Sequence, residues 1–599
     1  MFSEFSMTEL SLAFLMGIRF DFSILMMLAA PMILGNCLPL KLRDFRAFRI
    51  TINSISIGAV FLALSFNFTD AIYYRYTLKR MTFDVFSYIE KTAAFWDVAP
   101  QMMLDYWYTW MISILLLILM IWLFKRTNFI ESEKPLYNWS KRIKDSLTFL
   151  ASIAIIIIGI RGGFQLKPIN IVDAAKNVPS QLTPLVLNTP FTIVKSYGQT
   201  GLDEKSYFEQ KELNVLFNPL KSYSSVDGNE MKNVVVIILE SFSSEYIGYL
   251  SGKESFTPFL DSLFEQSLAF KGTANGKRSI EGIPAVLSSL PTLSDESFLN
   301  SPYAANNIEG MAHTLNKYNY NTAFFHGGKN GTMSFDSYAK AAGFHQYFGK
   351  NEYPNQEDYD GYWGIWDEEY LQYFKEELSG MQQPFLGVVF TLSSHHPFRV
   401  PDRYEGKFPK GELPIQQCLA YTDHALSLFF KEAEKKPWFN KTLFVITADH
   451  TGEGSELKYQ NSLGQFSIPI TFYAPGDSTL SAQHTQTPVQ QTDILPSVID
   501  YLGVTDTLVC FGSSIFDTNR QPFAINFFNQ KFQLLDEQYL LQSQADQLLG
   551  LYEYRQDSLL KNNFLGNRNI DSLLLFQKAF IQQYNNRMIR NQIKYKGNE

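Results

Sequence analysis

Two carboxylates and an imidazole stand directly after two aliphatic runs of this sequence. Glu240 follows the run 233–239 (NVVVIIL), and Asp449 and His450 follow the run 442–448 (TLFVITA). Carboxylate and imidazole groups together suit Mn²⁺ or Zn²⁺, and Mg²⁺ accepts carboxylates as well. The three side chains therefore form a candidate metal site, provided that the two runs are neighbours in the fold.

A serine between these two runs is a candidate nucleophile. Ser279 follows Lys277 and Arg278 in the stretch Gly-Lys-Arg-Ser. A divalent ion would lower the pKa of a coordinated hydroxyl, so that Ser279 could attack as its alkoxide. The alternative is an ordinary helix N-cap, since a helical run opens at Ile280. Lys277 and Arg278 either offset the charge of a phosphate or are solvated surface cations.

Both aliphatic runs have the composition of buried parallel strands, which are apolar on both faces. Open α/β sheets place their ligands at the carboxyl ends of such strands, where Glu240 and Asp449 stand. Further strands are expected at 384–390 (PFLGVVF) and 468–473 (IPITFY), with helical patterns between the strands. The alternation predicts an α/β catalytic domain over residues 230–520, with helices on both faces of the sheet.

Five short segments give the chain a resemblance to a known family. In their order along the chain they are similar to segments of the alkaline phosphatase/sulfatase superfamily, and more narrowly of the lipoteichoic acid synthase-like membrane enzymes. The resemblance implies an α-helical transmembrane region followed by an extracytoplasmic α/β domain of the sulfatase/alkaline phosphatase type. The segments are 257–263 (TPFLDSL), 276–282 (GKRSIEG), 394–398 (SHHPF), 421–426 (YTDHAL) and 447–450 (TADH).

The resemblance also implies an activity, that of a membrane-anchored, metal-dependent phosphotransferase. Such an enzyme moves a head-group phosphate ester of the glycerophosphate type from a membrane phospholipid to a glycolipid, a glycan or water. Ser279 would carry the phosphate as a phospho-serine intermediate, although the family more often has threonine there. Glu240, Ser279, Asp449 and His450 would coordinate one divalent ion, for which Mn²⁺ is favoured and Zn²⁺ and Mg²⁺ are the alternatives.

Two histidines join Lys277 and Arg278 as candidates for substrate binding. His395 matches the substrate-binding histidine of the family, and it would bind the phosphate or protonate a leaving oxygen. His326 ends the apolar run 322–325 and so reaches the same edge of the sheet. Whether His326 lines the pocket stays open.

Other functions on the same fold are a phosphoethanolamine transferase, a phosphodiesterase and a sulfuric ester hydrolase. Sulfatases need a C/S-x-P-S/A-R motif, and the residues after Ser279 (Ile-Glu-Gly-Ile) lack its proline and arginine. Phosphoryl transfer is therefore favoured over sulfate hydrolysis. A catalytically silent binding or scaffold protein is the non-enzyme alternative, which the joint presence of all four metal-site residues disfavours.

Composition excludes some classes of protein. The 599 residues include 51 Lys and Arg against 59 Asp and Glu, and the net charge of −8 disfavours nucleic acid as a partner. Three cysteines, Cys37, Cys418 and Cys510, provide no disulfide framework and no CxxC motif. An aromatic content of 15% fits a membrane protein with interfacial Tyr, Trp and Phe.

The N-terminal region 1–162 is predicted to span a membrane about four times. Its apolar stretches are long enough to cross a bilayer. The loops 41–49 and 125–144 are rich in Lys and Arg, so they are expected in the cytoplasm, with the chain after residue 161 outside. Together with the resemblance, this implies a multi-pass protein of the inner (cytoplasmic) membrane of a bacterium with a periplasmic catalytic domain. The predicted spans are 22–40, 50–68, 106–124 and 143–160.

The remaining parts are a connector, 163–229, and a C-terminal subdomain, 521–599, that packs on the catalytic domain. Two strands are expected in the subdomain, at 548–555 and 558–564, followed by a helix from Asp571. No chemistry is expected there. His484 would serve as ligand of a second metal ion, but its glutamine-rich surroundings favour an ordinary loop histidine.

Overall fold

The computed structural model divides into two compact units, which are described separately. The helical unit comprises Met1–Gly201 and Asn300–Asn306, and the sheet unit comprises Leu202–Leu299 and Asn307–Glu599. The structure describes residues 5–77, 80–83, 85–86, 106–127, 139–179, 182–198, 201–224, 231–480, 483–485, 487–544, 547–566, 568 and 570–597.

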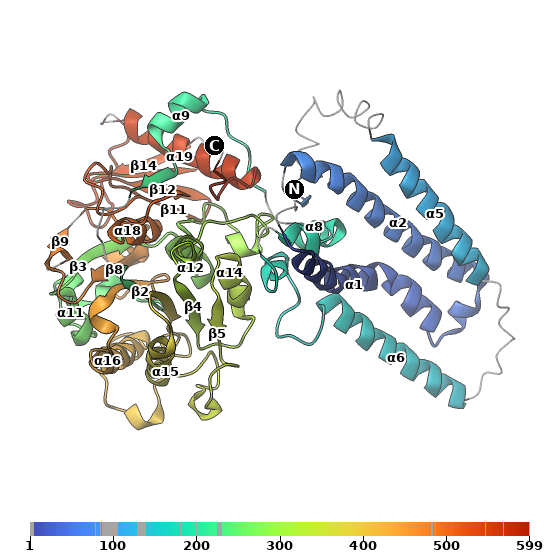
Figure 1. Cartoon of the computed structure of the whole chain (residues 1–599), viewed down its shortest axis with the longest axis horizontal. Helices are drawn as coiled ribbons and strands as arrows, with labels where there is room; N and C mark the ends of the chain where they lie inside the picture. The colour runs from blue at the N-terminus through green and yellow to red at the C-terminus, as the bar shows by residue number, and fades with distance from the viewer. Residues whose placement is uncertain are drawn as a thin grey trace. The chain divides into compact units, whose positions relative to one another are not determined.

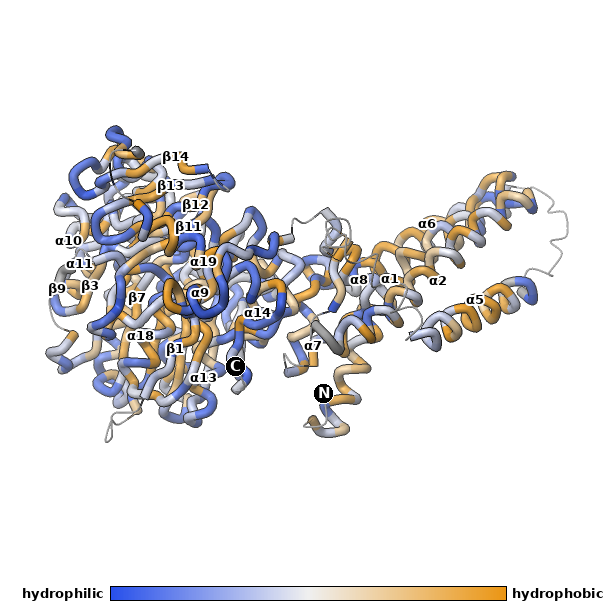
Figure 2. The backbone as a smooth tube through the Cα atoms, turned by 90° about the horizontal axis from the view of Figure 1, so that it is seen from above, coloured by the Kyte–Doolittle hydropathy of each residue, from blue (hydrophilic) through white to orange (hydrophobic). Residues whose placement is uncertain are grey.

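Long apolar helices dominate the helical unit. Helix α1 packs against both α2 and α6, and α5 packs against α2. Figure 2 shows apolar residues along all four helices, as expected of helices that face lipid. The bounds are Met7–Cys37 for α1, Arg46–Thr77 for α2, Trp107–Thr127 for α5 and Trp139–Arg161 for α6.

Three helices of the described chain are long and apolar enough to cross a membrane: Met7–Cys37, Arg46–Tyr74 and Arg142–Arg161. The fourth predicted span, 106–124, falls in α5, whose apolar part Trp107–Leu123 is shorter. Four spans were predicted, and the structure supports three of them by length and composition. The predicted membrane-anchored character of the N-terminal region is confirmed at this coarser level.

Helix α1 begins 15 residues before the predicted span 22–40. Ser6 caps it, accepting a hydrogen bond from the Glu9 N–H while the Glu9 carboxylate accepts from the Ser6 N–H. The charged residues Arg19 and Asp21 lie inside this apolar helix, and both have hydrogen-bond partners within the unit. Arg19 Nε donates to the Gly162 carbonyl at 2.6 Å, and Asp21 Oδ1 accepts from Asn188 at 2.9 Å.

The predicted connector 163–229 is shared between the two units. Its short helices α7 (Thr183–Val186) and α8 (Thr189–Ser196) pack on α1. From Leu202 onward the chain belongs to the sheet unit, where α9 (Gln210–Leu216) packs against the C-terminal helix. Residues 225–229 and most of the stretch 82–101 lie outside the described residues.

Eight strands of the described sheet unit form one sheet, in the order β5-β4-β6-β2-β7-β8-β3-β9. Strand β8 runs antiparallel to both of its neighbours, and the other described pairs are parallel. The bounds are β2 Asn233–Leu239, β3 Leu268–Thr273, β4 Asn321–His326, β5 Gln346–Phe348, β6 Phe385–Phe390, β7 Thr442–Ala448, β8 Ser467–Tyr473 and β9 Gln483–Thr485.

The two predicted strands β2 and β7 are neighbours at the centre of this sheet. Every residue of both is buried, which explains why their sequences are aliphatic without alternation. They pair in parallel, with Leu239 level with Ala448. Glu240 and Asp449, which directly follow these two strands, are therefore neighbours at the carboxyl edge of the sheet. The predicted α/β class is confirmed.

Two groups of helices cover the sheet, which lies between them in Figure 1. One group consists of α11, α15 and α16, and the other includes α12, α13 and α18. In this arrangement Ser279, the first residue of α12, lies at the carboxyl edge of the central strands. The bounds are α11 Pro258–Phe264, α12 Ser279–Ser288, α13 Met311–Asn316, α15 Asp367–Gly380, α16 Ile415–Ala433 and α18 Ile494–Tyr501.

The C-terminal region forms an antiparallel sheet in the order β11-β12-β13-β14, followed by α19 (Asp571–Ile589). Three of these strands precede the two predicted ones. The predicted strand 548–555 corresponds to β14, but 558–564 is not a strand because it turns back after Asp557, whose carboxylate accepts the Asn562 N–H. The strands are β11 Ala524–Phe528, β12 Lys531–Leu535, β13 Leu540–Gln544 and β14 Gln547–Tyr552.

Candidate metal centre and nucleophile

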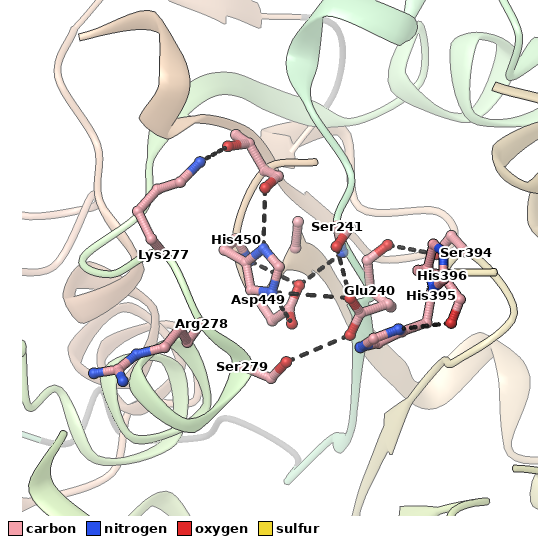
Figure 3. A network of polar contacts seen from close by, with 12 residues as sticks. Glu240, Ser241, Lys277, Arg278, Ser279, Ser394, His395, His396, Asp449 and His450 are labelled. Carbon is pink, nitrogen blue, oxygen red and sulfur yellow. Dashed lines mark hydrogen bonds and ion pairs between the residues drawn. The ribbon is translucent and has the colours of Figure 1, made fainter. Parts of the chain in front are cut away.

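Glu240, Asp449 and His450 converge at the carboxyl ends of β2 and β7 (Figure 3). One ligand atom from each of the three lies within 4.8 Å of the others. His450 Nε2 lies 3.2 Å from Asp449 Oδ2 and 3.8 Å from Glu240 Oε1. The structure thus brings together the three side chains that the sequence proposed as metal ligands.

The donor atoms of this trio fit a cation. Asp449 Oδ1 accepts the N–H groups of Ser241 at 2.8 Å and of His450 at 2.7 Å, whereas Oδ2 is buried without a hydrogen-bond partner among the described residues. His450 Nδ1 lies 3.0 Å from the Thr451 carbonyl, which can only accept, so Nδ1 carries the hydrogen. The lone pair of Nε2 then faces two carboxylates. Three electron-rich atoms directed at one another are stable around a positive ion.

Burial, followed by the charge of Asp449, raises the pKa of Glu240 well above its usual range. A cation in the centre would reverse this effect, because it favours the charged carboxylate. The Ser241 hydroxyl already donates to Glu240 Oε1 at 2.6 Å. Glu240 is therefore held in place while its second oxygen, Oε2, stays directed at Ser279.

Several residues that position the metal ligands were not identified from the sequence. The Glu240 N–H donates to Thr391 Oγ1 at 3.0 Å, and Ser394 Oγ donates to the Glu240 carbonyl at 2.5 Å. Gln491 Nε2 donates to the carbonyls of both Ala448 and Asp449, each at 2.8 Å. Only Thr391 had a signal in the sequence that could have identified it, because it directly follows a predicted strand, β6, which pairs with β2.

Ser279 is the first residue of α12, and its side chain is buried against Glu240. Its hydroxyl donates to Glu240 Oε2 at 3.4 Å. The N-cap of the helix is Arg278 rather than Ser279, and the Glu281 carboxylate accepts the N–H groups of Lys277 at 2.7 Å and Arg278 at 3.1 Å. The alternative role of Ser279 as an N-cap is therefore not the one that the structure shows.

The charged ends of Lys277 and Arg278 point away from the Ser279 hydroxyl (Figure 3). Lys277 Nζ donates to Thr451 Oγ1 at 2.7 Å and to the Gln465 carbonyl at 2.8 Å. Burial lowers the pKa of Lys277 to about 8. The Arg278 guanidinium donates to Glu281 Oε1 at 2.8 and 2.6 Å. Both cations thus have protein partners that stabilise the start of α12 and the segment after His450.

His395 lies in the segment that follows β6, and its ring stacks on Trp363 with 3.6 Å between the centroids. Its Nδ1 lies 3.2 Å from the His396 carbonyl, and the Trp363 indole N–H donates to the same carbonyl at 2.5 Å. Burial lowers the pKa of His395, and the negative charge of Asp449 opposes this shift. The ring is therefore neutral at pH 7, with Nε2 as a hydrogen-bond acceptor near the trio.

His326 ends β4 as predicted but is packed among aromatic rings. Its Nδ1 lies 3.1 Å from the Tyr347 hydroxyl, and its ring stacks on Phe390 with a centroid distance of 5.5 Å. Burial lowers its pKa to about 4. None of the described contacts of His326 is with a residue of the metal centre. The structure therefore supports a packing role for it.

Asp423, in the similar segment 421–426, and His484 were the remaining polar residues of interest. Asp423 in α16 accepts the N–H groups of Phe259 and Leu260, both at 2.9 Å, and so satisfies the start of α11. His484 lies in β9, and its side chain lies outside the described part of the structure.

Comparison with known proteins shows which sequences this chain is similar to. Residues 232–504 match the family model described as Sulfatase. Among curated relatives, lipoteichoic acid synthase 2 of Bacillus subtilis is 27% identical over 372 residues, and the lipoteichoic acid synthase-like protein YvgJ of the same organism is 23% identical over 365 residues. These alignments cover 57% and 56% of this chain, but only 55% and 59% of the respective relative.

Solved structures show the same fold. A protein of the alkaline phosphatase superfamily from Vibrio parahaemolyticus superposes with a TM-score of 0.58 at 23% identity, covering 67% of this chain and 99% of that one. The lipoteichoic acid synthase LtaP from Listeria monocytogenes superposes with a TM-score of 0.52 at 18% identity, covering 63% and 98%. The resemblance seen in the sequence is confirmed: residues 232–504 are similar to the Sulfatase family, this region shares its fold with a solved protein of the alkaline phosphatase superfamily, and a set of apolar helices precedes it in the chain.

Proposed function

We propose that this protein is a membrane-anchored, metal-dependent phosphotransferase with Ser279 as its nucleophile. It would move a head-group phosphate ester of the glycerophosphate type from a phospholipid to a glycolipid, a glycan or water. One observation carries the proposal. The buried Ser279 hydroxyl lies 3.4 Å from Glu240 Oε2, beside a set of metal ligands in which Asp449 Oδ2 has no partner among the described residues.

Glu240, Asp449 and His450 would hold one divalent ion, with Ser279 Oγ as a further ligand. Two carboxylates and one imidazole suit Mn²⁺ or Zn²⁺, and Mg²⁺ is the third candidate. When bound, such an ion supplies positive charge that lowers the pKa of a serine hydroxyl and offsets the charge of a phosphate.

The residues of the chain account for the other requirements of the transfer. Glu240 Oε2 accepts the hydrogen bond of the Ser279 hydroxyl and so orients its oxygen. Ser279 is at the N-terminus of α12, where the helix dipole favours negative charge. Both effects stabilise an oxygen that becomes an anion as it attacks phosphorus.

The transfer has two balanced steps. In the first, Ser279 Oγ loses its proton and bonds to phosphorus, the bond from phosphorus to the diacylglycerol oxygen breaks, and that oxygen takes up a proton. In the second, an acceptor hydroxyl loses its proton and bonds to phosphorus, the bond from phosphorus to Ser279 Oγ breaks, and Oγ takes up a proton. His395 suits the proton transfer at the acceptor oxygen, because its Nδ1 is engaged with the His396 carbonyl and its Nε2 is an acceptor.

The orientation of the helices supports access to lipid head groups from outside the cell. The turn between α1 and α2 carries Lys41, Arg43 and Arg46, and α5 ends with Lys125 and Arg126. Positive loops of this kind lie in the cytoplasm. With α5 as the fourth span, as predicted from the sequence, the chain after α6 would emerge on the opposite side. A reporter fused after Gly163 should therefore be active only outside the membrane. Cytoplasmic activity at that position would contradict the orientation.

The proposal is tested by trapping the intermediate. Full-length protein in phospholipid vesicles is given Mn²⁺ and a phosphatidylglycerol labelled in its head group, and is then quenched with acid and digested. The expected result is a glycerophosphate adduct on the peptide that contains Ser279, and no adduct in Ser279→Ala. A label on another peptide, or an equal label in Ser279→Ala, would mean that Ser279 is not the nucleophile.

A further inference from the structure

The buried carboxylate of Asp367 lies outside the metal centre but binds the segment that carries His395. Asp367 is the first residue of α15 and is 2% exposed. Its Oδ1 accepts the N–H groups of Leu392 at 2.8 Å and Ser393 at 3.2 Å, and its Oδ2 also accepts the Ser393 N–H, at 3.2 Å. The Asp367 N–H in turn donates to Ser393 Oγ at 3.0 Å. The start of α15 is therefore joined to the segment after β6.

A motif of α16 also binds this carboxylate. Thr422 is buried, and its Oγ1 donates to Asp367 Oδ2 at 2.7 Å. The hydroxyl of the preceding residue, Tyr421, accepts the Glu368 N–H at 3.2 Å. Thr422 and Tyr421 belong to the segment 421–426, one of the five that resemble the known family, but they have no part in the proposed reaction. In the fold, this segment supports Asp367 and the start of α15.

The Asp367 carboxylate accepts hydrogen bonds from N–H and O–H groups, and among the described residues it forms no ion pair with Lys or Arg. Burial raises the pKa of Asp367, whereas the hydrogen bonds from Leu392, Thr422 and Ser393 lower it. A buried carboxylate without a cation is costly to keep, and a network that satisfies both of its oxygens fixes one geometry. Here that geometry belongs to the segment 391–396.

The hydrogen bonds to Asp367 lie in the middle of this segment, between its two contacts with the backbone of a metal ligand. On one side, Thr391 Oγ1 accepts the Glu240 N–H at 3.0 Å. On the other, Ser394 Oγ donates to the Glu240 carbonyl at 2.5 Å. His395 comes next in the chain, and Figure 3 shows Ser394 and His395 beside Glu240. The place of His395 therefore depends on the backbone that Asp367 binds.

We propose that Asp367 is a positioning residue of the transfer reaction and that Thr422 supports it. Together they fix the segment 391–396, so that the His395 imidazole is held where an acceptor oxygen would lose its proton. The inference rests on the proposed function, in which His395 acts in the second step. It goes beyond that function because it assigns a role to two residues with no described contact to Ser279 or to the side chains of the metal ligands.

The first measurement reports the position of His395 and does not depend on catalysis. Full-length protein in detergent is treated with diethyl pyrocarbonate, and carbethoxylation of His395 is resolved from that of His396 by mass spectrometry. Asp367→Asn replaces an acceptor oxygen with a donor group, so it should loosen the segment and label His395 several-fold faster. Asp423→Asn, which changes a buried acceptor at the start of α11 instead, should label like the parent. Equal rates in Asp367→Asn and the parent would overturn the proposal.

The second measurement separates the two steps of the transfer, with labelled phosphatidylglycerol and Mn²⁺. Because a misplaced His395 slows the second step, turnover of Asp367→Asn should fall roughly 10- to 100-fold, while the fraction of protein that carries the Ser279 adduct rises. A purely structural role would lower the melting temperature and leave both quantities unchanged in the folded protein. Thr422→Val, which removes only the hydroxyl, should act in the same direction by a smaller factor. Thr422→Ser, which keeps the hydroxyl, should behave like the parent.

A double variant shows whether the effect acts through His395. In a His395→Gln background, Asp367→Asn should change turnover and adduct little further, because the position of an absent imidazole no longer matters. Additive effects of the two substitutions would contradict the proposal, as would a normal adduct fraction in Asp367→Asn. If even the parent forms no Ser279 adduct, the proposed function fails, and the labelling of His395 still decides whether Asp367 fixes its position.

Discussion

A Cβ atom at Gly282 would lie 2.1 Å from the backbone carbonyl oxygen of Asp449. This contact joins α12, which begins with the proposed nucleophile Ser279, to the segment that carries two of the proposed metal ligands. The neighbour is backbone, and Gln491 Nε2 holds the same carbonyl at 2.8 Å. Neither side can yield to a side chain at position 282. The short distance from Ser279 to Glu240 therefore depends on a glycine here.

Replacing Gly282 by alanine should separate α12 from Asp449. We expect a loss of about 1–3 kcal/mol in the free energy of unfolding, as for overpacked sites, and a fall in turnover of about 100-fold from the displaced nucleophile. Thermal denaturation and head-group transfer would be measured together. Gly380→Ala is the matched control, because a Cβ there has no atom within 4 Å. Normal turnover in Gly282→Ala would show that the helix can shift without harm.

Removing the Ser279 hydroxyl should abolish turnover and leave the fold intact. Covalent nucleophiles contribute several orders of magnitude in rate, whereas the 3.4 Å hydrogen bond to Glu240 contributes at most about 1 kcal/mol to stability. Ser279→Thr should keep measurable activity, since it retains a hydroxyl. Ser262→Ala, an exposed serine of α11, is the control. If Ser279→Ala turns over at the normal rate, another group performs the attack.

Removing the proposed metal ligand Asp449 should affect the melting temperature in opposite directions with and without metal. Without added metal, Asp449→Asn should melt at the same temperature as the parent or higher, because it relieves the repulsion between Asp449 and Glu240. With Mn²⁺ at 100 times its dissociation constant, the free energy of unfolding of the parent should rise by about 2.7 kcal/mol. That of the variant should rise far less. Asp402→Asn, whose carboxylate is 99% exposed, should behave like the parent. Elemental analysis should find one ion per chain, and two would require a second site.

Asp423 should make stability depend on pH. Burial raises its pKa to about 7 from an ordinary value of 3.8. The folded state therefore binds this proton more tightly than the unfolded state does. The contribution of protonated Asp423 to the free energy of unfolding is complete at low pH and is lost as pH rises from about 4 to 7. The slope is at most about 1.4 kcal/mol per pH unit.

The measurement for this prediction compares the parent with Asp423→Asn, which cannot ionise. The variant should gain in melting temperature relative to the parent as pH rises through this window. Asp402→Asn should show no such trend. A difference between the parent and Asp423→Asn that stays constant from pH 4 to 8 would mean that Asp423 remains charged throughout.

Sequence reasoning was most reliable where a single local property decides the structure. Strands β2 and β7 were predicted because a run of mostly apolar residues without polar alternation is typical of a strand that is buried on both faces. It was less reliable for α1, which begins at Met7, whereas the first predicted span begins at residue 22. Arg19 and Asp21 are tolerated inside the helix because Gly162 and Asn188, far away in sequence, supply their partners.

The sequence by itself determined the kinds of chemical group at the site. Glu240, Asp449 and His450 directly follow two strands whose apolar composition predicts parallel pairing, and parallel strands place the residues after them at one edge of the sheet. Only the tertiary structure decided which of the other candidates reach it. Lys277, Arg278 and His326 are of the right type and in the right segments, but their polar atoms are hydrogen-bonded to Gln465, Glu281 and Tyr347, respectively. Glu281 is close to Arg278 in the sequence, whereas Gln465 and Tyr347 are distant from their partners. Such distant hydrogen bonds have no signature in local composition, since burial and partner are properties of the folded chain.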